Sequence, residues 1–262
     1  MVSFKCGTKV NVVPAAAEAL FEGLDGDETE ALAKSMEEEL GITFTVSSED
    51  GCLKIAASGE NEHASTPWKG KNALTGLLAL IERLPLAECG QLKAVRALNH
   101  LMPHGDWFGA GLGIQISDEE SGELTLAFSM LDISEKSLEG EFDSRCPICA
   151  TKENTIDVIR KNMEAEGISF NTEELEPPHH VPADSDFVKT LLSAYESYSG
   201  RKGECIAIGG GTYVHHLKNG VAFGACLPET ENHMHGPDEF AVVDELLMSA
   251  KIFAQVIVDL CS

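Results

Sequence analysis

The chain has 262 residues, enough for one large domain or two ordinary ones, and its 43% hydrophobic residues can form a packed core. Its 43 acidic and 19 basic side chains give a formal net charge of −24, and such a surface repels nucleic acids and anionic membranes. We therefore expect no nucleic-acid partner and no membrane partner. We also expect no membrane-spanning segment and no secretory signal, and the eight cysteines are too sparse for a disulfide scaffold. These features predict a cytoplasmic protein.

The first part of the chain alternates between predicted strands and helices. The expected elements are a strand at 8–13, helices at 15–21 and 27–40, strands at 42–47 and 52–58, helices at about 70–84 and 92–101, strands at 111–116, 122–131 and 138–143, and a helix at 155–166. Hairpin-like strand pairs between helices favour a two-layer α/β sandwich over a parallel doubly wound sheet.

A second block begins after the pair Pro177-Pro178, which marks our expected domain boundary. Its expected elements are a helix at 185–199, a strand at 204–208, a glycine loop, a strand at 221–225 and a helix at 242–260. Two short strands cannot make a well-covered α/β sheet alone. The second block is therefore expected to be half of a domain, completed by sequence before Met1 or by a partner chain.

Two loops of this second block could bind an anion or a metal ion. In loop 209–212 the amides of Gly210, Gly211 and Thr212 could approach an anion closely, although a tight structural turn explains the same residues. His235, in the polar loop 233–239, could offer an imidazole to a metal or be an ordinary exposed histidine. The sequence contains no HExxH segment to supply companion ligands.

Two polar residues of the first part are also candidates. His63 lies among small polar residues, where it could donate a hydrogen bond to a developing oxyanion or cap a helix. Arg145 ends a predicted strand, where it could clamp a carboxylate or form a surface ion pair. Cys146 and Cys149 have a redox or zinc spacing, but without a second Cys/His pair two ordinary reduced thiols are the simpler interpretation.

Five segments carry a specific combination of motifs. They are SFKCGT with NVVP in 3–14, HASTP at 63–67, DSRCP at 143–147, GGGTY at 209–213 and HGPDE at 235–239. In this order and spacing they resemble the PepV-type dipeptidases, within the di-zinc metallopeptidase clan that includes carnosinase, carboxypeptidase G and acetylornithine deacetylase.

The resemblance implies a domain layout. Residues 1–176 resemble the lid domain, which grips the substrate, and the elements of about 85–140 resemble the enlarged PepV-type lid that substitutes for a dimer partner. Residues 177–262 resemble the C-terminal portion of the catalytic domain. The implied fold is α/β with an α+β lid: a two-layer sandwich with an enlarged insertion, then an incomplete half of a zinc-peptidase catalytic domain.

The resemblance also implies a substrate, an unblocked dipeptide. Asn11 resembles the lid residue that contacts the amino end of the substrate. Arg145, together with Gly210, Gly211 and Thr212, resembles the group that holds the substrate's carboxylate.

For catalysis, the resemblance implies two zinc ions, with manganese or cobalt as alternatives. His235 resembles the metal ligand near the C-terminus, and His63 resembles the lid histidine that stabilises the tetrahedral intermediate after metal-activated water attacks.

The chain departs from the family pattern because the remaining ligands and the general-base glutamate precede the lid in the family. We therefore expect a piece of a longer enzyme that lacks the N-terminal half of the catalytic domain. By itself this piece is expected to bind no metal stably and to be inactive. A smaller departure is Cys6, where the family usually has glycine. Two alternatives remain: an N-acyl-amino-acid deacylase of the same clan, and a non-catalytic module that binds peptide carboxylates.

Overall fold

The computed structural model describes residues 1–224, 226–232 and 238–261. The chain divides into two compact units, Met1–Pro178 and His179–Ser262, next to the Pro177-Pro178 pair. The assignment of these units to a lid and to part of a catalytic domain stays a prediction. Within the described residues, none of the helices is long and apolar enough to span a membrane.

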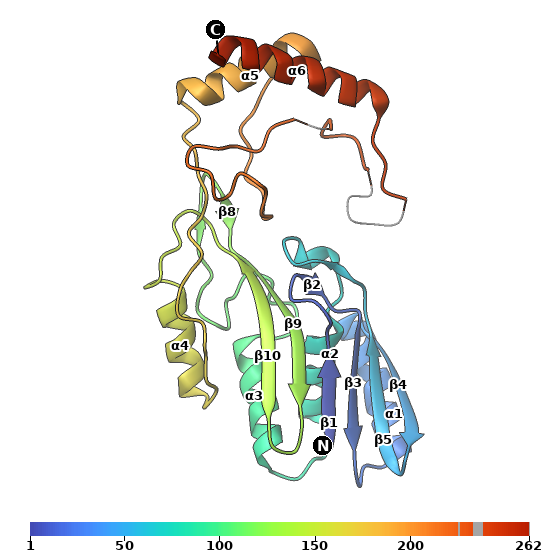
Figure 1. The fold of residues 1–262 in the computed structure, drawn as a ribbon. Helices are drawn as coiled ribbons and strands as arrows, with labels where there is room; N and C mark the ends of the chain where they lie inside the picture. The colour runs from blue at the N-terminus through green and yellow to red at the C-terminus, as the bar shows by residue number, and fades with distance from the viewer. Residues whose placement is uncertain (225, 233–237, 262) are drawn as a thin grey trace. The chain divides into compact units, whose positions relative to one another are not determined.

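A six-stranded sheet forms the centre of the first unit (Figure 1). In the order β10-β9-β1-β3-β5-β4, its strands are Leu138–Arg145, Thr125–Ile133, Ser3–Cys6, Ala16–Phe21, Cys52–Ser58 and Thr43–Glu49. Each strand is antiparallel to its neighbours. The unit is thus a mixed α/β structure with a mainly antiparallel sheet, as the sequence predicts.

Helices pack against this sheet and form the second layer. They include α1 (Gly26–Leu40), α2 (Ala73–Arg83) and α3 (Gly90–Leu101), which lie behind the sheet in Figure 1; α4 (Ile156–Ala165) follows later in the chain. Helix α2 buries Leu74, Leu77 and Ile81 at helical spacing and contacts β3, β5 and β9. The hydrophobic core of the first unit therefore lies between α2 and the sheet.

The predicted helix at 15–21 is wrong, because this segment forms strand β3. Its side chains alternate, with Ala17, Ala19 and Phe21 buried, and its backbone pairs with β1 on one side and β5 on the other. Alanine, glutamate and leucine favour a helix locally. Ladder hydrogen bonds on both edges and burial of the alternate face outweigh that preference.

The predicted strand at 8–13 is also largely wrong. The chain forms β1 earlier, turns at Gly7 with φ of 85°, and resumes pairing only at β2 (Val12–Val13). A Cβ atom at Gly7 would lie 2.1 Å from the carbonyl oxygen of Ser129, so this close approach requires glycine.

The predicted strand at 111–116 is a loop instead. The carboxylate of Asp106 accepts hydrogen bonds from the backbone amides of Phe108, Ala110 and Gly111, at 3.2, 3.1 and 2.9 Å. Within 111–116, the amide of Gly111 is held by this carboxylate, and the amides of Gly113 and Ile114 donate to the carbonyl oxygens of Ala110 and Gly109 in the same loop. These amides are therefore not available to a neighbouring strand.

Strand β9 is buried on both faces. Leu126 and Phe128 belong to the main core, whereas Ala127 packs with Val13 and Ala64 in a separate small cluster. Val13 lies in β2, which contacts β9. The segment around β2 therefore covers the face of β9 that the helices leave open.

The second unit is built on two helices, α5 (Asp186–Ser199) and α6 (Val243–Cys261). They bury Leu191, Ala194, Ile252 and Val256 against each other. The predicted strands at 204–208 and 221–225 are wrong for the residues described, 204–208 and 221–224, which form no strand. A strand needs a neighbour for its backbone hydrogen bonds, and the described part of this unit provides none.

His104 connects two helices of the first unit. Its Nε2 lies 2.8 Å from the carbonyl oxygen of Leu40, at the end of α1, and its Nδ1 lies 2.8 Å from the hydroxyl of Thr75 in α2. A carbonyl oxygen only accepts, so Nε2 carries the proton and the neutral ring accepts from Thr75. Burial lowers the pKa of His104 below the ordinary value of 6.5.

We expect the free energy of unfolding to fall as the pH drops below about 6.5. In that window the unfolded chain takes up a proton that the buried ring resists, and the loss continues until the pH passes the lowered pKa of the folded state. Urea titrations between about pH 8 and pH 5.5 should show this slope, and His104→Gln should flatten it while costing about 1–2 kcal/mol at neutral pH. His100→Gln, at an exposed position, is the matched control. An unchanged slope in His104→Gln would contradict the assignment.

Candidate functional site

A two-stranded ribbon brings Asn11 and His63 together. Strand β2 pairs with β6 (Glu62–His63), and Val12 lies opposite His63. The backbone amide of Ala64 donates to the carbonyl oxygen of Asn11 at 3.0 Å. Two candidate residues that are far apart in the sequence therefore lie next to each other on the β2–β6 ribbon.

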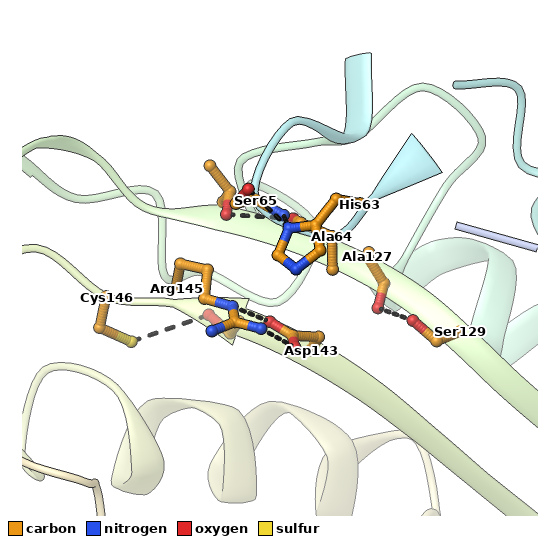
Figure 2. A network of polar contacts seen from close by, with 10 residues as sticks. His63, Ala64, Ser65, Ala127, Ser129, Asp143, Arg145 and Cys146 are labelled. Carbon is orange, nitrogen blue, oxygen red and sulfur yellow. Dashed lines mark hydrogen bonds and ion pairs between the residues drawn. The ribbon is translucent and has the colours of Figure 1, made fainter. Parts of the chain in front are cut away.

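The ribbon is joined to the end of β10 through β9. The hydroxyl of Thr125 donates to the carbonyl oxygen of Ala64 at 3.4 Å, and Thr125 is the cross-strand partner of Arg145. In Figure 2 the imidazole of His63 projects toward the side of the sheet that carries Arg145 and Asp143. The structure thus gathers three predicted residues, Asn11, His63 and Arg145, in one region of the first unit.

The hydrogen bonds of His63 define its tautomer. Its Nδ1 accepts from the backbone amide of Ser65 at 3.2 Å and lies 2.7 Å from the Ser65 hydroxyl. An amide nitrogen can only donate, so in the neutral ring the proton is on Nε2. Glu62 holds the segment that follows His63: its Oε1 accepts hydrogen bonds from the backbone amide of His63 at 2.8 Å and from the hydroxyl of Thr66 at 3.1 Å. His63 therefore has one remaining ring donor, Nε2–H.

Arg145 is paired with a carboxylate of its own strand. Its Nε and Nη2 donate to Oδ1 and Oδ2 of Asp143, at 2.6 and 2.7 Å. The Arg145 side chain is 28% exposed and that of Asp143 is 10% exposed. An ion pair was one of the two interpretations of Arg145 in the sequence, and it is present here. It uses two of the five guanidinium hydrogens and leaves the others for a further acceptor.

Aromatic side chains lie beside this region. Trp68, in the short helix η1 (Pro67–Lys69), stacks on Phe108 with ring centroids 5.9 Å apart. Trp107 meets the edge of the same Phe108 ring at 6.4 Å, and its carbonyl oxygen accepts from the amide of Leu126 in β9 at 2.8 Å. Both tryptophans are thus neighbours of the segments that carry His63 and Thr125.

The remaining candidates belong to the second unit or lie outside the described residues. Loop 209–212 is largely exposed, and a Cβ atom at Gly210 or Gly211 would meet nothing within 4 Å. The carbonyl oxygen of Thr212 accepts from the amide of His215 at 3.1 Å. Whether this loop binds an anion together with Arg145 stays a prediction. His235 is one of the residues outside the described part.

The Cys146–Cys149 segment is held by a carboxylate. Asp118 accepts from the amide of Cys149 at 3.0 Å and from the amide and hydroxyl of Ser121, and these bonds keep the pKa of Asp118 well below its usual range. Burial raises the pKa of the Cys146 thiol. A thiol with a raised pKa is a poor nucleophile and a poor metal ligand, in agreement with two ordinary reduced thiols.

Metal-ligand side chains do not gather in the described part of the chain: no three His, Cys, Asp or Glu residues there are placed to share an ion. The residues described therefore do not form a catalytic metal centre, which needs at least three protein ligands in a typical zinc site.

Sequence reasoning missed Asp143, Glu62 and Ser65. The pairing of Asp143 with Arg145 could have been predicted, because residues two apart on a strand lie on the same face and can form an ion pair. The contacts of Glu62 and Ser65 with His63 depend on the conformation of the loop.

The family of the chain is given by comparison of its sequence with known protein families. Residues 33–259 match the family model described as peptidase family M20/M25/M40. The chain belongs to this family, and its resemblance to dipeptidases of the family is confirmed.

Curated relatives of the chain are named as dipeptidases. One of them is YtjP of Bacillus subtilis, which is named provisionally as a dipeptidase. It is 36% identical to this chain over 261 residues, and the alignment covers 99% of this chain and 55% of YtjP. The Beta-Ala-Xaa dipeptidase of Lactobacillus delbrueckii subsp. lactis is 31% identical, over 98% of this chain and 54% of that protein. The chain spans about half the length of the curated relatives it matches.

Proposed function

We propose that this chain carries the substrate-binding residues of a dipeptidase that hydrolyses unblocked dipeptides. The observation that supports the proposal best is the meeting of Asn11, His63 and Arg145 through the β2–β6 ribbon and β9. An unblocked dipeptide has a free amino group and a free carboxylate separated by one peptide bond. Recognition of both ends selects dipeptides against longer peptides and blocked amino acids.

Each residue has a separate role in this proposal. Asn11 contacts the amino end of the dipeptide, and Arg145 binds its carboxylate with the guanidinium hydrogens that Asp143 leaves free. His63 donates its Nε2–H to the oxyanion of the tetrahedral intermediate, because its Nδ1 is engaged by Ser65.

Further contacts to the dipeptide carboxylate come from loop 209–212 in this proposal. Gly210, Gly211 and Thr212 supply backbone amides, which are suitable donors to an anion.

In the complete protein, residues 1–176 act as the lid and residues 177–262 complete the catalytic domain. Two observations support this division. The relatives are almost twice as long as the chain, which covers 55% of YtjP. In the second unit, α6 leaves Leu247, Ile257 and Val258 more than half exposed, at 56, 61 and 55%, as expected for an apolar face that another segment covers.

The complete protein is proposed to depend on zinc. His235 is the candidate ligand within this chain, and the other ligands belong to the part of the relatives that this chain does not span.

The isolated chain is expected to show no dipeptidase activity with added zinc or cobalt, because a single candidate ligand cannot hold a catalytic ion. The assay compares the 262-residue chain with a version extended N-terminally to the length of the relatives. Each protein is given an unblocked dipeptide and an N-acetyl amino acid. Dipeptide hydrolysis by the extended version alone is the expected result.

Other outcomes of this assay decide between the alternatives. Preferential cleavage of the N-acetyl amino acid would identify a deacylase. Binding of the dipeptide by both proteins without cleavage would identify a non-catalytic carboxylate-binding module. Turnover by the isolated chain that disappears in His235→Ala would show that it contains a metal site of its own.

A further inference from the structure

We propose that Asp143 is a positioning residue, which orients the guanidinium of Arg145 so that its outer edge faces a carboxylate ligand. The carboxylate role of Arg145 rests on the proposed function, whereas its orientation by Asp143 rests on the geometry of the first unit alone.

The first support is the geometry of the pair. Both carboxylate oxygens of Asp143 accept, one from Nε and one from Nη2 of Arg145, at 2.6 and 2.7 Å. Two parallel hydrogen bonds to the side of the guanidinium fix the plane of the group as well as its position. The Asp143 side chain is nine-tenths buried, so the anchor itself has little freedom to move.

The second support is the register of the strands. Asp143 lies opposite Ala127 and Arg145 lies opposite Thr125, after an irregularity in the pairing between Glu141 and Phe142. Without this β-bulge, the same two residues would lie opposite Phe128 and Leu126, whose large side chains belong to the main core. The bulge instead leaves the pair beside small side chains, on the face covered by the β2–β6 ribbon.

The third support is the set of guanidinium hydrogens of Arg145 that Asp143 does not engage. Asp143 engages the Nε hydrogen and one Nη2 hydrogen, which leaves both Nη1 hydrogens and the second Nη2 hydrogen. One Nη1 hydrogen and the remaining Nη2 hydrogen lie on the terminal edge of the guanidinium, where a second carboxylate can accept two parallel hydrogen bonds. Asp143 therefore orients Arg145 without occupying the edge that would meet the ligand.

Two explanations of the role of Asp143, orientation of the Arg145 guanidinium and a simple effect of net charge, predict opposite effects of Asp143→Asn on anion binding. If only net charge mattered, removal of a negative charge beside Arg145 would strengthen the attraction for an anion. If Asp143 positions the guanidinium, the same change loosens it and weakens anion binding. A neutral substitution of Asp143 thus separates the two explanations.

The experiment follows the side-chain Nε–Hε signal of Arg145 by NMR in the 262-residue chain, with Arg145→Lys to assign the signal. In wild-type protein this hydrogen should exchange slowly with water. Added acetate should shift the Nη signals of Arg145, and acetamide, which has the same shape without the charge, should not. In Asp143→Asn we expect faster exchange of Hε and about tenfold weaker acetate binding, as for loss of one charge-assisted hydrogen bond.

Two variants serve as controls. Asp132→Asn removes the same charge from an exposed position on β9 and should leave both measurements unchanged. Asp143→Glu keeps the carboxylate on a longer side chain and should restore part of the slow exchange if the backbone amide spectrum shows a folded protein.

Two results would overturn the proposal: an Hε exchange rate in Asp143→Asn equal to that of wild type, or tighter acetate binding by that variant. Faster Hε exchange in Asp143→Asn, combined with no acetate response in wild type, would support the orientation by Asp143. The same result would overturn the carboxylate role that the proposed function gives to Arg145.

Discussion

Replacing Arg145 with alanine is expected to abolish the distinction between a dipeptide and its C-terminal amide in the N-terminally extended protein. Wild type should prefer the free acid, because the guanidinium donates charge-assisted hydrogen bonds to the carboxylate. Loss of these bonds costs about 1.5–3 kcal/mol, which corresponds to a fall of about 10- to 100-fold in kcat/KM for the acid. The amide should be hydrolysed by both proteins at nearly equal rates.

The measurement is kcat/KM for one dipeptide acid and its amide, in wild type and in Arg145→Ala. Arg160→Ala is the matched control, because Arg160 is also partly exposed and paired with carboxylates in the first unit. If Arg145→Ala still prefers the acid, the carboxylate is held elsewhere, and loop 209–212 becomes the first candidate.

Replacing His63 with alanine is expected to reduce kcat in the extended protein by about 10²–10³-fold, with little change in KM. The reason is the tautomer that Ser65 imposes on the ring: with Nδ1 accepting from the Ser65 amide, Nε2–H can donate to an oxyanion. An oxyanion exists only after attack on the peptide carbonyl, so the hydrogen bond stabilises the transition state more than the bound substrate.

Single-turnover and steady-state rates should be compared for wild type, His63→Ala and His100→Ala. His100 is an exposed histidine whose side chain pairs with Glu166, so its loss should leave kcat unchanged. A His63→Ala enzyme with unaltered kcat would return His63 to a structural role in its loop. A rise in KM with unaltered kcat would assign His63 to substrate binding.

The elements that were predicted best from the sequence are those whose ends are marked by capping or turn residues. The predicted helix at 27–40 is confirmed as α1: Asp25 caps its first turn and Gly41, with φ of 63°, ends it. The predicted strand at 52–58 is confirmed as β5. In contrast, β3 was mistaken for a helix, because the hydrogen bonds that make it a strand come from β1 and β5.

The site could be predicted only as a set of separate motifs. Resemblance to a family pointed to Asn11, His63 and Arg145, but their meeting depends on the β2–β6 ribbon and on Thr125. The pairing of Arg145 with Asp143 depends further on a β-bulge, which has no distinct signature in the residue types.

The aromatic residues of the chain give the two units different optical properties. Both tryptophans, Trp68 and Trp107, contact Phe108 in the first unit, whereas the three tyrosines, Tyr195, Tyr198 and Tyr213, all lie in the second. Tryptophan emission therefore reports on the first unit, and on the neighbourhood of His63 in particular. Tyrosine absorbance, separated from the overlapping tryptophan band in second-derivative spectra, reports on the second unit. A single denaturation experiment can therefore follow both units without any added label.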